Sequence, residues 1–288
     1  MTTKKELLQR EVTRIDTPKV ETMNDVHRLR VLVPPGNWAD TDPFLVLVED
    51  WFTGLAFGDH PHRGFETVTY MIDGRTSHFD NHGNKGLTGP GEALWLTAGR
   101  GIVHNEVPVG DAHLLQLWVN LPRAQKNVKA NFQEMKFVNT PRRNLPGVEV
   151  IVFSGGSGDV ESPIRNHAKV TMVEVRLEPN AVFSQELPAN YNGFVVVLSG
   201  AGKVGATGVS GGQVARLKRE SAESQVKFAG GEYGMRVMLY AGLPLNEPVV
   251  ARGPFVMNTD EEIISAYAQF REEGVRFGLA GSPFMVQT

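Results

Sequence analysis

Short apolar runs rich in β-branched residues, separated by turn signals, fill the first half of the chain. Such runs predict strands at residues 44–48, 67–72, 93–96 and 114–119. One run ends at Asp73-Gly74, a dipeptide that favours a tight hairpin turn. Gly89-Pro90-Gly91 marks another reversal of the chain. The pattern therefore predicts strands that fold back on one another into a small barrel.

A second block of strands repeats features of the first in the same order. Residues 70–74 resemble 196–200, and residues 91–96 resemble 212–217. Their common order indicates an internal duplication. We therefore expect two domains, at residues 1–138 and 148–288, joined by a linker at 139–147.

The clearest helix signal lies near the C-terminal end of the chain. Thr259 is a suitable N-cap, and Glu262 three residues later completes a capping box. Ile263 and Phe270 belong to an apolar stripe at helical spacing. These residues predict one short helix at about 260–273.

Composition and charge narrow the possible functions. The net charge is -3 and the pI about 6.3, so no basic surface for nucleic acid or an anionic membrane is indicated. The chain has no cysteine, which excludes disulfides, thiolate ligands and a cysteine nucleophile. The first residues lack the apolar core of a secretory signal, and no apolar run approaches the roughly 20 residues that span a bilayer. We expect a cytoplasmic protein without membrane or direct nucleic-acid partners.

Two pairs of potential metal ligands stand at strand spacing. His60 and His62 are two residues apart, and so are His104 and Glu106. Side chains two apart on a strand point to the same face. If the barrel brings the pairs together, three imidazoles and one carboxylate form a site for a divalent transition metal.

The second copy carries no equivalent site. His167 is the only histidine after residue 150. The second domain is therefore expected to be a scaffold, a partner surface or a pocket wall.

The motifs around these ligands resemble those of a known family. HPHRGFETVTY at 60–70 and GPGEALWLTAGRGIVHNE at 89–106 are similar to the signature of the pirins, within the cupin superfamily. GPFVMNTDEEI at 253–263 resembles the C-terminal motif of that family. The resemblance covers roughly residues 25–275.

The resemblance implies an all-β fold, with two antiparallel cupin (jelly-roll) β-barrels packed face to face and a short C-terminal helix. It implies one metal, Fe²⁺, in the N-terminal barrel, with His60, His62, His104 and Glu106 as ligands. A nitrogen-rich site binds Cu²⁺, Ni²⁺ or Zn²⁺ more tightly than Fe²⁺ by intrinsic affinity, so these metals stay open, as do Mn and Co.

The neighbouring residues include one alternative metal ligand and several residues that are not expected to bind the metal. Glu66 shares strand parity with His60 and His62, and it is the ligand in many cupins; the pirin resemblance favours Glu106, which leaves Glu66 a supporting role. Arg63 and Arg100 flank the ligands and are expected to pair with acidic neighbours. Three histidines are expected to be structural or solvated: His78, His82 and His113.

The resemblance supports two hypotheses about function. Some pirins act as quercetin 2,3-dioxygenases, which cleave flavonols. Four protein ligands would leave two metal positions for a phenolic substrate and O₂. If Glu106 loosens from the metal, it could act as the base that takes the proton of the flavonol 3-hydroxyl. Other pirins are regulators, so the alternative is a redox- or metal-sensing protein that binds a transcription factor or metabolic enzyme.

Overall fold

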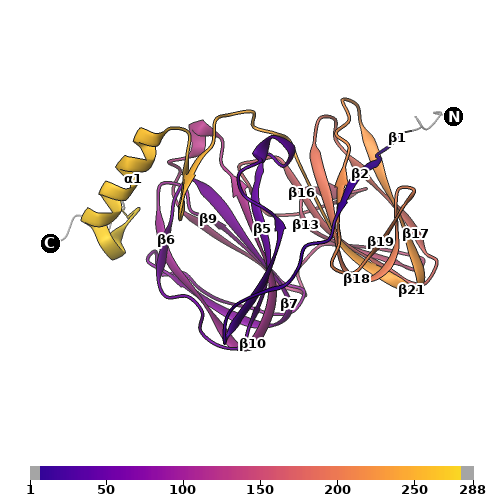
Figure 1. The fold of residues 1–288 in the computed structure, drawn as a ribbon, viewed down its shortest axis with the longest axis horizontal. Helices are drawn as coiled ribbons and strands as arrows, with labels where there is room; N and C mark the ends of the chain where they lie inside the picture. Colours follow the sequence, from indigo (N-terminus) through magenta and orange to yellow (C-terminus); the bar gives the residue numbers. More distant parts are fainter. Residues whose placement is uncertain (1–6, 280–288) are drawn as a thin grey trace. The chain divides into compact units, whose positions relative to one another are not determined.

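A computed structural model describes residues 7–279 as two compact units (Figure 1). We call them the N-terminal barrel, which contains residues 19–39, 43–139 and the chain from 245 onward, and the C-terminal barrel, which contains the chain up to 18, 40–42 and 140–244. Each is built on one large sheet, as the sequence predicts for an all-β protein. Within the described residues, no helix is long and apolar enough to cross a membrane.

The N-terminal barrel is a nine-stranded sheet in which every paired strand is antiparallel. Its strands are β3 (Glu21–Asn24), β4 (His27–Val33), β5 (Phe44–Phe52), β6 (His60–His62), β7 (Phe65–Asp80), β8 (Lys85–Thr88), β9 (Ala93–Thr97), β10 (Ile102–Asn120) and β11 (Asn131–Met135). The order is β11-β9-β7-β10-β5-β4-β3, with β6 on β10 and β8 on β7. The predicted strands at 44–48, 67–72, 93–96 and 114–119 fall inside β5, β7, β9 and β10.

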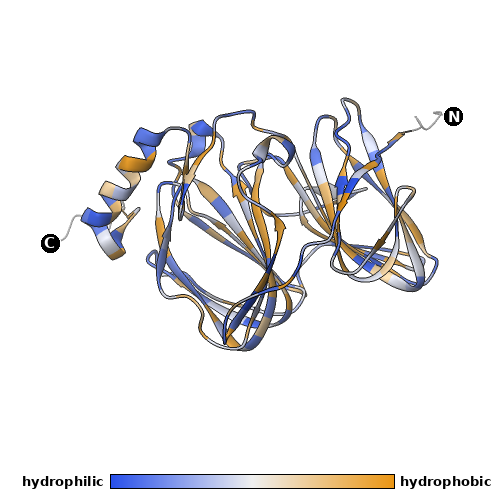
Figure 2. Cartoon of the chain, in the orientation of Figure 1, coloured by the Kyte–Doolittle hydropathy of each residue, from blue (hydrophilic) through white to orange (hydrophobic). Residues whose placement is uncertain are grey.

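The C-terminal barrel is a ten-stranded sheet around a valine-rich core. Its strands are β1 (Leu8–Gln9), β2 (Val12–Asp16), β12 (Arg142–Leu145), β13 (Val148–Ser154), β16 (Val170–Leu177), β17 (Val182–Leu187), β18 (Asn192–Val204), β19 (Thr207–Ser210), β20 (Val214–Leu217) and β21 (Ser224–Gly242). Hydrophobic and hydrophilic positions alternate along its strands (Figure 2), as expected for a sheet with one face in the core. A small ribbon, β14 (Gly156–Ser157) and β15 (Val160–Glu161), accompanies it.

The predicted C-terminal helix is present as α1 (Asp260–Glu273). The Thr259 side chain accepts a hydrogen bond from the Glu262 N–H, and the Glu262 carboxylate accepts one from the Thr259 N–H, so the capping box is complete. The helix packs Ile263 and Ala266 against the ribbon of β22 (Val250–Arg252) and β23 (Phe255–Met257). It therefore covers part of the N-terminal barrel.

Both ends of the chain depart from the expected domain boundaries. β1 and β2 pair with β21 and β20 of the C-terminal barrel, although they precede the first copy in the sequence. Residues from 245 onward, with α1, group with the N-terminal barrel. The expected linker contains β12, which pairs with β13. Internal similarity reveals only the repeated motifs, and it carries no information about which sheet edge a terminal segment joins.

Candidate metal centre

Strand pairing brings three of the predicted ligands together. β6 runs antiparallel to β10, with His60 opposite His104 and His62 opposite Ile102. One ring nitrogen of each of His60, His62 and His104 lies within 4.8 Å of the others. The parity of the two sequence pairs is thus realised in space, and the three histidines could hold a metal ion.

A backbone hydrogen bond orients His60. Its Nδ1 lies 2.9 Å from the Gly58 carbonyl oxygen, to which it donates its proton. The neutral ring then keeps Nε2 as its electron-pair donor. This is the usual way in which proteins fix the tautomer of a metal-binding histidine.

A second histidine stands behind His104. His78 Nε2 donates to Asp80 Oδ2 at 3.1 Å, so His78 Nδ1 is left as an acceptor. His104 Nδ1 lies 3.5 Å from that atom, a long contact that favours the proton on His104 Nδ1. The Nε2 atom of His104 is buried and has no hydrogen-bond partner. The network therefore leaves the lone pair of Nε2 for a cation.

Burial favours the uncharged form of two of the rings. Burial lowers the pKa of His62 to about 3, with a further contribution from His60, while the Pro254 carbonyl opposes the shift. Burial also places the pKa of His104 well below its usual value, and the neighbouring histidines add to this effect. His62 Nδ1 is buried without a hydrogen-bond partner. Uncharged imidazoles with unsatisfied nitrogens are suited to a divalent transition metal, so the residues present fit such an ion.

Glu106, the fourth predicted ligand, is held slightly apart from the histidines. It lies two residues after His104 on β10 and lines the same cavity. Its Oε1 accepts a hydrogen bond from the Thr69 hydroxyl at 2.6 Å, and Gln116 Nε2 lies 3.4 Å from its Oε2. The cluster within 4.8 Å contains only the three histidines. Coordination by Glu106 stays a prediction.

His60 and His62 line a cavity of about 780 Å³ inside the N-terminal barrel. Most of its lining is apolar, and it comes from β4, β5, β10 and the β22–β23 region. The lining residues are His27, Leu29, Pro35, Trp38, Leu45, Val46, Val48, Asp50, Phe52, Phe57, His60, His62, Glu106, Leu114, Gln116, Trp118, Ala251, Gly253, Pro254 and Val256. A site of this size and character suits a small aromatic molecule.

The remaining flanking residues have structural contacts. Glu66 is fully buried, accepts a hydrogen bond from the Thr97 hydroxyl at 2.8 Å and does not line the cavity. Arg63 donates to Gln269 of α1, and Arg100 donates to the Gly278 carbonyl. Both arginines therefore hold the C-terminal segment against the barrel, and Arg63 also interacts electrostatically with Glu273 and Glu262 of α1.

The residues that contact the predicted ligands from behind are only weakly indicated by the sequence. His78 was expected to be structural or solvated; it is 1% exposed and lies against His104. The signal was its spacing from Asp80, two residues apart on one strand, as in the ligand pairs. Thr69 and Gln116 gave no signal, because their role depends on the pairing of β7 with β10.

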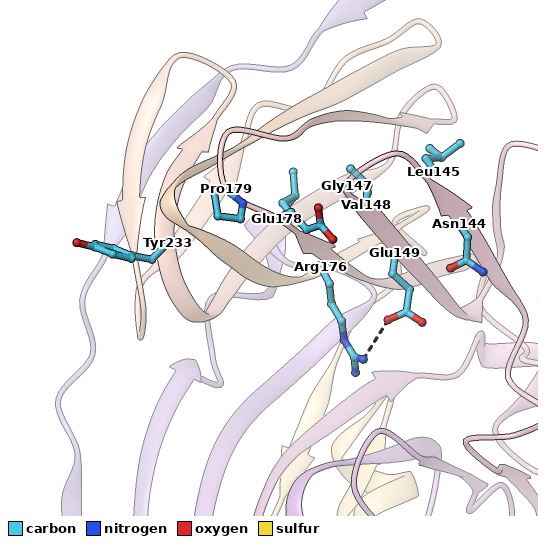
Figure 3. Close-up of a pocket in the computed structure, with 10 residues that line it drawn as sticks. Asn144, Leu145, Gly147, Val148, Glu149, Arg176, Glu178, Pro179 and Tyr233 are labelled. Atoms are coloured by element: carbon cyan, nitrogen blue, oxygen red, sulfur yellow. Dashed lines mark hydrogen bonds and ion pairs between the residues drawn. The ribbon is translucent and has the colours of Figure 1, made fainter.

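The C-terminal barrel has a pocket of a different kind. It measures about 420 Å³, and an ion pair between Arg176 and Glu149 at 3.0 Å crosses it, with Tyr233 at its edge (Figure 3). No histidine lines it. Among the described residues, the three-histidine cluster therefore belongs to the N-terminal barrel.

Comparison with known proteins gives a consistent result. The Pirin family model matches residues 36–119, and the model of the pirin C-terminal cupin domain matches residues 172–278. Human Pirin is 38% identical over 244 residues, which cover 80% of this chain and 81% of that protein. The chain belongs to the pirin family.

Two solved structures show the same fold. The crystal structure of a Geobacillus kaustophilus protein is 42% identical with a TM-score of 0.82, over 85% of this chain and all of the other. A quercetin 2,3-dioxygenase from Acinetobacter baumannii is 29% identical with a TM-score of 0.83, over 93% of this chain and 98% of that one. The pirin fold of two cupin domains is therefore established for this chain.

Proposed function

We propose that this pirin is an iron-dependent dioxygenase that cleaves flavonols such as quercetin. The observation that carries the proposal is the cluster of three histidines, of which His60 and His62 line a large apolar cavity together with Glu106. The similarity to a protein named quercetin 2,3-dioxygenase supports the substrate class. The proposed ligands are His60, His62, His104 and Glu106.

Glu106 is the proposed base. A bound transition metal would supply Lewis acidity and redox chemistry for the reaction of the substrate with dioxygen. The Glu106 carboxylate would accept the proton of the flavonol 3-hydroxyl. The Thr69 hydroxyl, 2.6 Å from Oε1, holds the carboxylate at the cavity wall, and Gln116 supports its other oxygen. A carboxylate fixed in this way loses little orientational freedom when the substrate binds.

The apolar wall has two tasks in this reaction. Phe52, Leu114 and Trp118 present flat or bulky apolar surface to a planar ring system. They also exclude water, which strengthens the polar interactions at the reacting end. In the balanced reaction, one flavonol and one O₂ give carbon monoxide and a ring-opened ester, so both oxygen atoms enter the products.

The alternative proposal is a regulatory protein whose metal state controls the binding of a transcription factor or metabolic enzyme. The curated relatives support it to the extent that they are named Pirin and not after a reaction. In that case the histidine cluster would bind metal with no turnover of flavonols.

Oxygen uptake and carbon monoxide release separate the two proposals. The protein is reconstituted with Fe²⁺ under anaerobic conditions, and quercetin and O₂ are then added. The dioxygenase proposal predicts equimolar O₂ consumption and CO release that disappear in His62→Ala. Tight metal binding without CO release would contradict the dioxygenase and favour the regulatory protein.

A further inference from the structure

A second polar pair lies in the same cavity and has no part in the metal centre. It arises from the alternation of β5, where two neighbouring carboxylates point to opposite faces of the sheet. Glu49 forms an ion pair with Arg30 and a hydrogen bond with His113 Nε2, which is 2.8 Å away. Asp50 faces the cavity, where it lies 2.7 Å from His27.

The His27–Asp50 pair is rigid and almost enclosed. The exposed fractions of the two residues are 6% and 7%. His27 Nε2 donates to Asp50 Oδ1, which leaves Nδ1 as the other hydrogen-bonding atom of the ring. The imidazole stacks on Phe52 at 4.5 Å between ring centroids and meets the edge of Phe57 at 5.4 Å. The aromatic contacts hold the ring in one orientation.

The pair is displaced from the metal centre across the sheet. Glu106 is hydrogen-bonded by residues of β7 and β10, whereas His27 and Asp50 belong to the next two strands, β4 and β5. Neighbouring strands are about 4.8 Å apart, so β4 is about 10 Å from β10. Phe57 lies between, with its ring near both His27 and His60.

The cavity therefore has two polar ends and apolar walls. Tryptophans aside, its polar lining consists of the groups around the metal centre and of His27 with Asp50. A flat ligand that coordinates at one end would place its far edge against the second pair. Apolar ligands would leave this buried pair without a partner, which costs binding free energy.

We propose that His27 and Asp50 form a recognition site for a second hydroxyl group of the ligand, so that the cavity selects extended polyphenols with polar groups at both ends. The inference rests on the proposed phenolic substrate class and deepens it. In this site, His27 Nδ1 accepts a hydrogen bond from the ligand hydroxyl, and Asp50 fixes the tautomer of the imidazole. The metal centre holds the chelating end.

Ligand pairs combined with variants test the site directly. Dissociation constants of quercetin and of 3-hydroxyflavone, which lacks the other ring hydroxyls, are measured under anaerobic conditions with the Fe²⁺-loaded protein. We expect the wild type to bind quercetin roughly tenfold or more tightly than 3-hydroxyflavone, because 3-hydroxyflavone leaves a buried hydrogen-bonding group without a partner. The variant His27→Phe with Asp50→Leu replaces both partners by apolar groups of similar shape. In this variant, the ratio of the dissociation constants of 3-hydroxyflavone and quercetin should fall towards one.

Glu49→Gln is the matched control, because it changes the adjacent carboxylate on the outer face of the same strand. It should keep the wild-type preference. A folded double variant with the wild-type preference would overturn the recognition site. If the double variant does not fold, His27→Phe alone replaces it, and an unchanged preference there overturns the site as well.

The outcomes also separate this site from the proposed reaction. If CO is released and the preference for quercetin over 3-hydroxyflavone is the same in the wild type and in the His27 and Asp50 variant, the recognition site alone is overturned. A preference that depends on the pair, without CO release, would support the site and contradict the dioxygenase. Failure of both ligands to bind would overturn both.

Discussion

Proton positions on the histidines decide what this site can bind. Asp80 accepts a hydrogen bond from the Nε2–H of His78, and the Nδ1 of His78, left as an acceptor, then favours a proton on the facing nitrogen of His104. Outer hydrogen bonds of this type fix the tautomer and raise the basicity of the ligand. His78 is therefore a positioning residue for the proposed metal.

Replacing His78 tests this role. We predict that His78→Asn lowers the affinity for Fe²⁺ or Zn²⁺ by about 10- to 100-fold, because His104 loses the partner that fixes its tautomer. Affinity is measured by competition with a chromophoric chelator, with folding checked by circular dichroism. His113→Asn, a histidine on the outer face beside Glu49, is the control. Equal metal affinities in the two variants would rule out this positioning role of His78.

Glu106 has the more demanding role. We predict that Glu106→Gln lowers turnover of quercetin by at least about 100-fold and changes quercetin binding far less, because the amide cannot accept the phenolic proton. Rates and dissociation constants are compared at equal metal content. Unchanged turnover in the metal-loaded variant would refute the base.

The sequence predicts single residues well where strand parity alone decides. The spacing of His60 with His62 indicates two ligands on one face, and in the structure a ring nitrogen of each lies within 4.8 Å of one of His104. Asp50 shows the limit. Its neighbour Glu49 is chemically similar, and which of the two faces the cavity depends on the register of β5 between β4 and β10.

At the scale of elements, the short strand β6 depends on its surroundings. Three residues cannot hold a strand by themselves, so contacts at Gly64 fix its end. Lys126, which is 1% exposed, donates to the carbonyl oxygens of Gly64 and Val256 at 2.8 and 3.1 Å. A Cβ at Gly64, where φ is +85°, would lie 1.9 Å from the Val256 oxygen. β23 and the ligand strand are thus fastened together at one point.

Gly64 and Gly83 have nearly the same positive φ, so comparing them separates the cost of a steric clash from the cost of the left-handed backbone conformation. Gly83 has φ of +86°, and a Cβ added there would meet nothing within 4 Å, unlike one at Gly64. We predict that Gly83→Ala costs about 1–2 kcal/mol of unfolding free energy, whereas Gly64→Ala costs more than that and also weakens metal binding. Urea unfolding and metal titration measure the two effects. Equal costs would mean that the contact with Val256 does not constrain β6.

Elements with complete local signals are predictable, and terminal strands are not. Thr259 and Glu262 lie within one turn of each other, so the start of α1 can be read from the sequence. β2 instead pairs with β20, about 200 residues away, through backbone groups that any sequence possesses. For that reason the domain boundaries differ from those the duplication indicates.

At the scale of the whole molecule, two related barrels have different chemistry. The N-terminal barrel contains the three-histidine cluster, while the apolar core of the C-terminal barrel is filled with valine and other apolar side chains. A family resemblance predicts this division because the ligand motifs occur in the first copy only. The shape of the cavity, assembled from four separate stretches of chain, is not visible in any single motif.

Buried histidines make the stability of the metal-free protein sensitive to pH. The pKa of His62 is lowered to about 3, so below pH 6.5 the unfolded chain binds a proton that the folded chain does not. The contribution of His62 to unfolding free energy therefore falls by up to about 1.4 kcal/mol per pH unit from pH 6.5 towards 3. Urea unfolding at pH 7.5 and 5.5, with chelator present, should give a smaller difference for His62→Phe than for the wild type. The same difference in both proteins would contradict a buried, uncharged His62.

The most direct test of the histidine metal centre is an anaerobic Fe²⁺ titration that follows stoichiometry and affinity. We predict one tight site per chain, lost in His62→Ala with His104→Ala and retained in His167→Gln, which alters the histidine of the C-terminal barrel. Retention of tight binding in the first variant would place the metal elsewhere and contradict the central claim.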